Sequence, residues 1–218
     1  MMPYAVLGLF IMFLIVTYIV VQGTRAALAW RQAAAEGDVE VIRTIVSDAI
    51  SVWNSQKRPK PVAPEVWRGI QSMQLLDVHP AYVRVSCLAE SEYKMQDGRW
   101  IEIRNPLQEG FAITVKAADM LFYELPHYQP DSIQVDVYTA YRSEGGATRR
   151  ECVLSTAATR EQAKQLDWEE WPPEEIVAAL DAHYRLSENG RPLPIEPLTP
   201  PPLPEAPADG GAPAEAFS

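Results

Sequence analysis

The sequence predicts an α+β fold. We expect an N-terminal single transmembrane helix, then a small domain with a mainly antiparallel four-stranded sheet (β-β-α-β-β-α), and a disordered Pro-rich tail. Three observations lead to this expectation: residues 4–21 carry no charge, residues 65–190 switch between strand and helix periodicity, and prolines crowd the chain after Arg191. The expected parts are a transmembrane anchor (1–23), juxtamembrane and amphipathic helices (24–55), a linker (56–64), the globular domain (65–190) and the acidic tail (191–218).

The anchor is the stretch YAVLGLFIMFLIVTYIVV, Tyr4–Val21. As a helix it covers about 27 Å, close to the ~30 Å thickness of the bilayer hydrocarbon. The run is longer than a typical signal-peptide core and no Lys or Arg precedes it, so we expect an uncleaved anchor. The alternative is a secreted protein whose first 29 residues are removed. Bases follow the span, which predicts a cell-membrane protein with its C-terminal domain in the cytoplasm; they are Arg25, Arg31, Arg43, Lys57, Arg58 and Lys60.

Two more helices are predicted before the sheet. Thr24–Ala35 continues the membrane helix, Gly37 ends it and Asp38 caps the next. That next helix, Val39–Trp53, carries an apolar stripe with a 3.6-residue period. The stripe packs either on its own domain or on a helix of a partner protein. Glu65–Met73 is predicted to form a short helix.

Alternating apolar residues predict two strands joined by a hairpin. Val83, Val85 and Cys87 lie on one face of Tyr82–Tyr93, and Asp97-Gly98 favours a tight turn. The returning strand, Arg99–Arg104, is expected to direct Ile101 and Ile103 inward. A helix then runs from Pro106 to Pro126.

A second hairpin and two helices follow. The strands are Ser132–Tyr141 and Thr148–Thr156, turned at Gly145-Gly146. Thr159 and Gln162 have the spacing of a capping box, and Glu174–Tyr184 begins with prolines and acids that favour a helix start.

Charge and composition exclude several classes of function. The net charge is −10, and residues 160–218 hold twelve acids against four bases, so a nucleic-acid partner is not expected. Cys87 and Cys152 lie far apart and are predicted to be reduced core residues. No phosphate-binding loop, nucleophile elbow or histidine cluster occurs in the sequence, so no cofactor or metal is expected.

One acid pair is a candidate catalytic site. Asp136 and Glu151 lie on the two strands of the second predicted hairpin and resemble the acid pair of the PD-(D/E)xK nucleases, which hold Mg²⁺ on adjacent strands. That family has a lysine two residues after the second acid, and Val153 stands in its place here. The resemblance implies no working nuclease, because no cation is present to polarise the attacking water.

The remaining candidates are residues for protein binding: Trp168 and Trp171 within an acidic segment, Tyr138 on a strand, and Trp53 on the amphipathic helix. The alternative is that Trp168 and Trp171 cover the sheet beside Leu166. Leu198–Pro204 is either a plain tail or a polyproline ligand for an aromatic groove. We therefore expect a non-enzymatic accessory, scaffolding or assembly subunit that binds the bilayer and other membrane-complex proteins. The alternative is a tethered ligand-binding or enzymatic domain whose site includes Asp136, Tyr138, Arg149 and Glu151.

Overall fold

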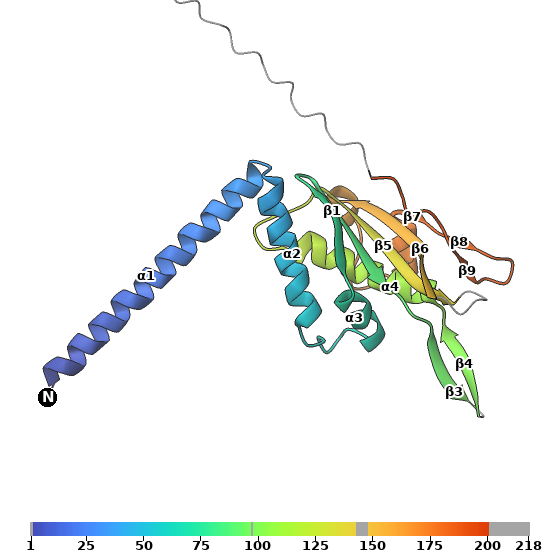
Figure 1. The fold of residues 1–218 in the computed structure, drawn as a ribbon, viewed down its shortest axis with the longest axis horizontal. Coiled ribbons are helices and arrows are strands. Elements are labelled where there is room, and N and C mark those ends of the chain that lie inside the picture. Colours follow the sequence, from blue (N-terminus) through green and yellow to red (C-terminus); the bar gives the residue numbers. More distant parts are fainter. Residues whose placement is uncertain (1, 97, 143–147, 201–218) are drawn as a thin grey trace, which may run out of the picture.

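The computed structural model describes residues 2–96, 98–142 and 148–200. A long helix leads into an α+β body built on a five-stranded mixed sheet of order β1-β2-β5-β6-β7, with two small two-stranded sheets beside it (Figure 1). The helices are α1 (Met2–Ala35), α2 (Val39–Ser55), α3 (Pro64–Gln71), α4 (Pro106–Asp119), the π-helix η1 (Met120–Glu124) that continues α4, α5 (Arg160–Ala163) and α6 (Pro173–Ala178). The strands are β1 (Gln74–His79), β2 (Tyr82–Leu88), β3 (Glu92–Gln96), β4 (Arg99–Arg104), β5 (Ser132–Arg142), β6 (Thr148–Thr159), β7 (Asp181–His183), β8 (Arg185–Leu186) and β9 (Pro192–Leu193).

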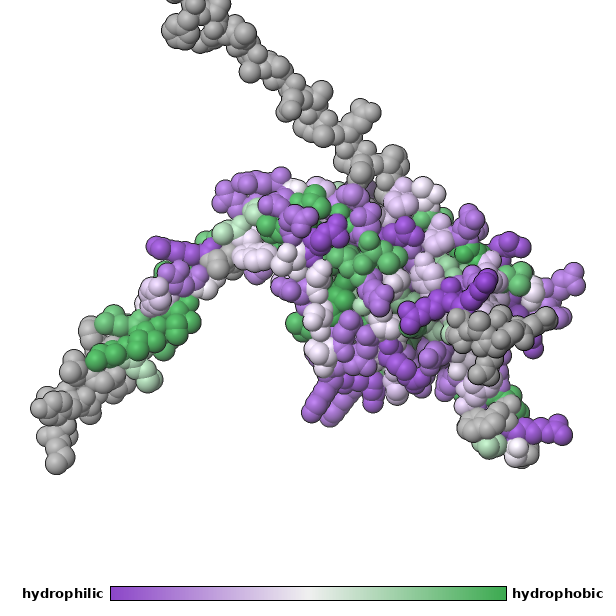
Figure 2. Space-filling view, viewed as in Figure 1, coloured by the Kyte–Doolittle hydropathy of each residue, from purple (hydrophilic) through white to green (hydrophobic). Residues whose placement is uncertain are grey.

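Helix α1 stands away from the body for most of its length (Figure 1). Its segment Ile11–Ala35 is long and apolar enough to cross a membrane, and Figure 2 shows a hydrophobic band on it. Thr17 donates its hydroxyl proton to the carbonyl of Phe13 at 2.8 Å, so this polar group is satisfied inside the helix. Near its C-terminal end α1 meets the body, where Arg31 Nε donates to His127 Nδ1 at 3.1 Å.

The predicted break after α1 is confirmed. Gly37 adopts a positive φ of 81°, and the side chain of Asp38 accepts hydrogen bonds from the backbone N–H groups of Glu40 and Val41. Helix α2 then buries its apolar stripe in the body's own core, as one of the two interpretations expected. The buried members are Ile42, Ile45, Val46, Ala49, Ile50 and Trp53.

The sheet differs from the predicted four-stranded antiparallel arrangement. An unpredicted strand, β1, pairs with β2, and β2 pairs in parallel with β5 rather than with β4. The segment predicted as one strand, Tyr82–Tyr93, ends at Leu88 and begins again at Glu92. A parallel pair needs a long crossover, and the hairpin β3–β4 followed by α4 supplies it.

The hairpin β3–β4 forms its own two-stranded sheet and projects from the body (Figure 1). The prediction that Ile101 and Ile103 point inward is wrong, because the hairpin does not join the main sheet and both side chains are exposed. Gly98 has a positive φ of 78°, which suits the tight turn; Asp97 lies outside the described residues.

The C-terminal part of the body also departs from prediction. The helix expected at Glu174–Tyr184 ends at Ala178, and Asp181–His183 pairs instead with the edge of β6, because that edge has free backbone groups to satisfy. The capping box of Thr159 and Gln162 is confirmed. The turn at Gly145-Gly146 lies outside the described residues.

The disorder predicted from Arg191 onward is wrong for the first ten residues of that segment. β9 pairs with β8, and Ile195 N donates to the carbonyl of Cys152 at 2.9 Å. Residues 194–200, here called the strap, then lie across the sheet. The remainder of the predicted tail, 201–218, is outside the described residues.

The two faces of the sheet have different coverings. A Cβ added to Gly110 of α4 would meet Val137 Cγ1 at 3.3 Å and Leu154 Cδ2 at 3.7 Å, so α4 lies directly on one face. Side chains alternate along a strand, so Asp136 and Ser155 lie on the opposite face. We call this the strap face; its side chains are polar where the α4 face is apolar.

Candidate binding surfaces

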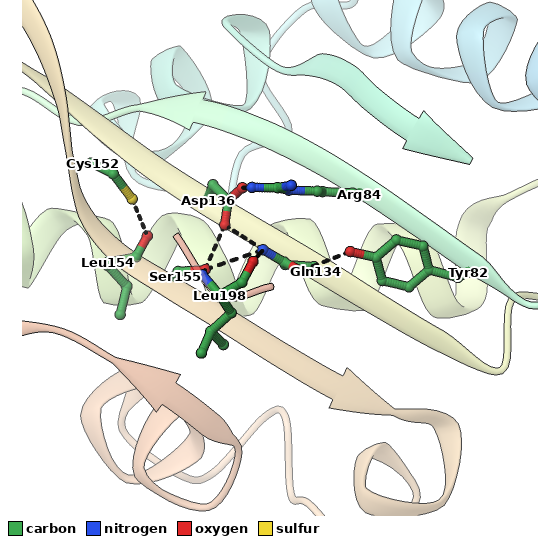
Figure 3. Close-up of polar contacts among 8 residues, drawn as sticks. All are labelled: Tyr82, Arg84, Gln134, Asp136, Cys152, Leu154, Ser155 and Leu198. Atoms are coloured by element: carbon green, nitrogen blue, oxygen red, sulfur yellow. Dashed lines mark hydrogen bonds and ion pairs between the residues drawn. The ribbon is translucent and has the colours of Figure 1, made fainter. Parts of the chain in front are cut away.

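A buried polar cluster occupies the strap face (Figure 3). Neighbouring strands supply its members in register: Tyr82 and Arg84 from β2, Gln134 and Asp136 from β5, and Ser155 from β6. The alternation that gives these strands an apolar face toward α4 places the intervening polar residues together on the other face.

Asp136 is the centre of this cluster, and its side chain is fully buried. Its Oδ2 accepts from Arg84 Nε and forms an ion pair with Arg84 Nη2, both at 2.7 Å. Its Oδ1 accepts from Ser155 Oγ at 2.6 Å and from Gln134 Nε2 at 2.9 Å. Both carboxylate oxygens are therefore engaged, as a buried charge requires.

The charges in the cluster support one another. Burial opposes the positive charge of Arg84, but the hydrogen bond and the negative charge of Asp136 outweigh it and raise the pKa of Arg84. Burial raises the pKa of Tyr82 and outweighs the opposing positive charge of Arg84; Asp136 adds to the increase. Tyr82 donates its proton to Gln134 Oε1 at 2.7 Å. Arg84 thus stays a cation and Tyr82 a neutral donor over the physiological range.

The strap is attached to this cluster through one residue. Leu198 N donates to Ser155 Oγ at 2.9 Å, and Gln134 Nε2 donates to the carbonyl oxygen of Leu198 at 2.9 Å. Figure 3 shows both bonds reaching the same peptide segment. The strap face is therefore filled, and the hollow beside it, near Tyr138 and Arg150, has only about 170 Å³.

The nuclease-like acid pair is not assembled. Asp136 lies opposite Ser155, whereas Glu151 lies opposite Thr139, about 10 Å further along β5. Glu151 lines a separate surface hollow with His183 and Arg185. Among the residues that the structure describes, no three His, Cys, Asp or Glu side chains are grouped to hold a metal ion.

The four predicted interaction residues lie in different environments. Trp53 is 5% exposed and belongs to the core, so it is not presented to a partner. Trp168 is half-buried, donates Nε1–H to the carbonyl of Ala163 at 2.9 Å and meets Tyr123 edge-on. Trp171 is 42% exposed. Tyr138 is half-buried on the strap face.

A surface that the sequence prediction missed is the projecting hairpin β3–β4. Four of its described side chains are large, apolar and 43–54% exposed: Tyr93, Met95, Ile101 and Ile103. At the hairpin's base is a hollow of about 520 Å³, lined by Tyr93 and Glu102 from the hairpin and by Tyr141 and Pro192 from the body. The period-two pattern of Arg99–Arg104 indicates a strand with apolar residues on one face, but we expected that face to be buried in the domain.

Comparisons with known proteins add no further constraint. The sequence matches no protein family, and no curated protein and no solved structure matches the chain.

Proposed function

We propose that the chain is a single-pass membrane-anchored, non-enzymatic accessory or scaffolding subunit, whose cytoplasmic body binds another protein of the same membrane through the hairpin β3–β4. The observation that carries this proposal is the exposure of Tyr93, Met95, Ile101 and Ile103 on a hairpin that projects from the body. An isolated two-stranded hairpin is only marginally stable in water. Tyr93 and Met95 expose apolar area on one of its faces and Ile101 on the other, so a partner that covers the hairpin is favoured.

The anchor supports a partner in the membrane. Segment Ile11–Ala35 has the length and composition of a membrane span, and the residues after it carry the bases expected on the cytoplasmic side. An anchored body meets other anchored proteins at a raised effective concentration, so a modest contact area is sufficient for assembly. The acidic balance of the chain disfavours nucleic acid as the alternative partner.

Site-specific photo-crosslinking in native membranes tests the hairpin contact. A photoreactive residue at Tyr93 is expected to give one adduct with a membrane protein, whereas the same residue at exposed Gln165 gives none. Adding Met95→Glu and Ile101→Glu, one on each face of the hairpin, should remove at least nine-tenths of the adduct, because each charge would be placed against an apolar surface. A Tyr93 adduct that persists with both glutamates, or its absence at native expression levels, would contradict the proposal.

The anchor and its orientation have their own test. The full chain is expected to resist carbonate extraction, to retain its N-terminal residues by intact mass, and to be digested by protease in inside-out vesicles only. Loss of the first 29 residues would establish a secreted protein instead, and digestion in right-side-out vesicles would reverse the orientation.

A further inference from the structure

The strap binds the sheet mainly through its backbone. In addition to the two bonds at Leu198, Ile195 N donates to the carbonyl of Cys152, and the carbonyl of Pro192 just before the strap accepts from Tyr141 Oη at 2.8 Å. The side chains of Glu196 and Thr199 are exposed. The side chains of Ile195, Pro197 and Leu198 are half-buried, so the strap face holds the extended backbone by hydrogen bonds and covers part of these three side chains.

The two groups that hold Leu198 are already positioned by the cluster beneath them. The Gln134 amide nitrogen donates to Asp136 Oδ1 and to the carbonyl of Leu198, both at 2.9 Å, and Ser155 Oγ is a longer third acceptor at 3.3 Å. Ser155 donates its proton to Asp136, which leaves a lone pair for the N–H of Leu198. Because Arg84 fixes Asp136, this donor–acceptor pair keeps its geometry without the strap, and little ordering cost accompanies peptide binding.

This geometry selects a chemical class of ligand. In an extended chain the N–H and C=O of one residue point to the same side, so a single residue can satisfy both Gln134 and Ser155. Proline is excluded at that position because it has no N–H, but prolines at neighbouring positions favour the extended conformation. Pro197 and Pro200 flank Leu198 in this way.

We propose that the strap face is a binding site for an extended, proline-flanked peptide segment, and that residues 194–200 occupy it as a ligand held within the same chain. A partner's segment of the same chemistry binds there by displacing the strap. This surface lies on the body of the domain and is separate from the hairpin, so the inference is independent of the proposed hairpin contact.

Because the strap is covalently attached to the body, it competes strongly with any external peptide for the strap face. A ligand joined by a short connection acts at an effective concentration on the order of millimolar, so an external peptide binds weakly while the strap is in place. Releasing the strap without altering the cluster is expected to strengthen external binding. Leu198→Pro does this, because it removes the N–H that Ser155 accepts, and Leu198→Ala is the matched control that keeps the N–H.

The test uses the full-length protein in detergent micelles and a fluorescent decapeptide of residues 191–200, with binding followed by anisotropy. The Leu198→Pro protein is expected to bind the decapeptide at least tenfold more tightly than the wild type and the Leu198→Ala protein. A decapeptide carrying Leu198→Pro should bind none of them. A folded Leu198→Pro protein that fails to bind the wild-type decapeptide, or that binds both peptides equally, would overturn the proposal.

A measurement on the wild-type protein covers the case in which Leu198→Pro does not fold. An excess of unlabelled decapeptide should accelerate hydrogen exchange at the protein's own Leu198 amide at least threefold, because the strap is displaced. The proline-substituted decapeptide should leave that exchange rate unchanged. Equal exchange with and without a millimolar excess of the wild-type decapeptide would show that the strap is a fixed part of the fold. Ile101→Glu protein should respond as the wild type does, which separates this result from the hairpin experiment.

Discussion

Replacing Asp136 by alanine should lower the free energy of unfolding by about 3–5 kcal/mol, the range for breaking a buried ion pair by removing one partner. The carboxylate is fully buried and accepts from Arg84, Gln134 and Ser155. Its removal leaves the Arg84 guanidinium, only 19% exposed, without its anion. Gln134 and Ser155 lose an acceptor as well, and the separate losses of roughly 1.5–3 kcal/mol per charged hydrogen bond do not simply add.

Urea unfolding of the full chain in detergent, followed by tryptophan fluorescence, measures this cost. The matched control is Asp131→Ala, an exposed acid just before β5, which should stay within about 0.5 kcal/mol of the wild type.

A double variant identifies the cause of the loss. Arg84→Met with Asp136→Leu removes both charges, so it should recover most of the stability lost by Asp136→Ala. A cost below about 1 kcal/mol for Asp136→Ala would refute the reasoning. A double variant no more stable than the single one would show that the unpaired cation is not the main source of the loss.

Three further predictions follow from the core. Gly69→Ala should destabilise the body by about 1–2 kcal/mol, because the new Cβ would lie 2.6 Å from Ile113 Cγ1 and closer to its Cδ1, an overpacking cost larger than the gain of about 1 kcal/mol in helix propensity. Ile113→Val should reduce that cost in a double-mutant cycle of urea unfolding, and strict additivity would contradict the packing. Burial raises the pKa of Cys87 and Cys152 to about 12, so a thiol reagent at pH 8 should label neither until urea unfolds the chain; rapid native labelling would contradict this. Burial also raises the pKa of Glu109 above 4.5, so its protonated form favours the folded state and stability should fall as pH rises from 4.5 through the raised value. Glu109→Gln should therefore be the more stable protein at pH 7 in thermal melts, and a wild type equal to it would count against the burial argument.

Local signals in the sequence were sufficient for the helices at the start of the chain. Gly37 and Asp38 mark the end of α1 and the start of α2, since a left-handed glycine and a capping aspartate act within one turn. The same holds for the capping box of Thr159 and Gln162. Each of these predictions depends on residues within three positions of one another, so it does not require knowledge of which distant segments pair.

The prediction of the sheet topology was wrong because strand pairing is decided by residues far apart in the sequence. Arg99–Arg104 has the alternation of a half-buried strand, yet no part of the described body covers Ile101 and Ile103, and both are exposed. β2 instead pairs with β5, which begins more than forty residues after β2 ends. The helix predicted over Asp181–His183 is wrong for the same reason. These residues form hydrogen bonds with the edge of β6, and helix propensity contains no information about such distant partners.

The strap face explains why composition misjudged the first residues of the tail. A proline-rich segment has little apolar side-chain area to bury, which is the usual argument for disorder. That argument omits the backbone. A chain that proline already holds extended loses less conformational entropy on binding, and the N–H and C=O of one residue are enough to bind a donor and an acceptor that are already in position. The hydrogen bonds of Gln134 and Ser155 to Asp136 position both side chains to bind the backbone of Leu198. Whether a proline-rich segment is ordered therefore depends on the hydrogen-bonding groups that the rest of the fold offers to its backbone. Here those groups are the side chains of Gln134 and Ser155, which Asp136 holds in place.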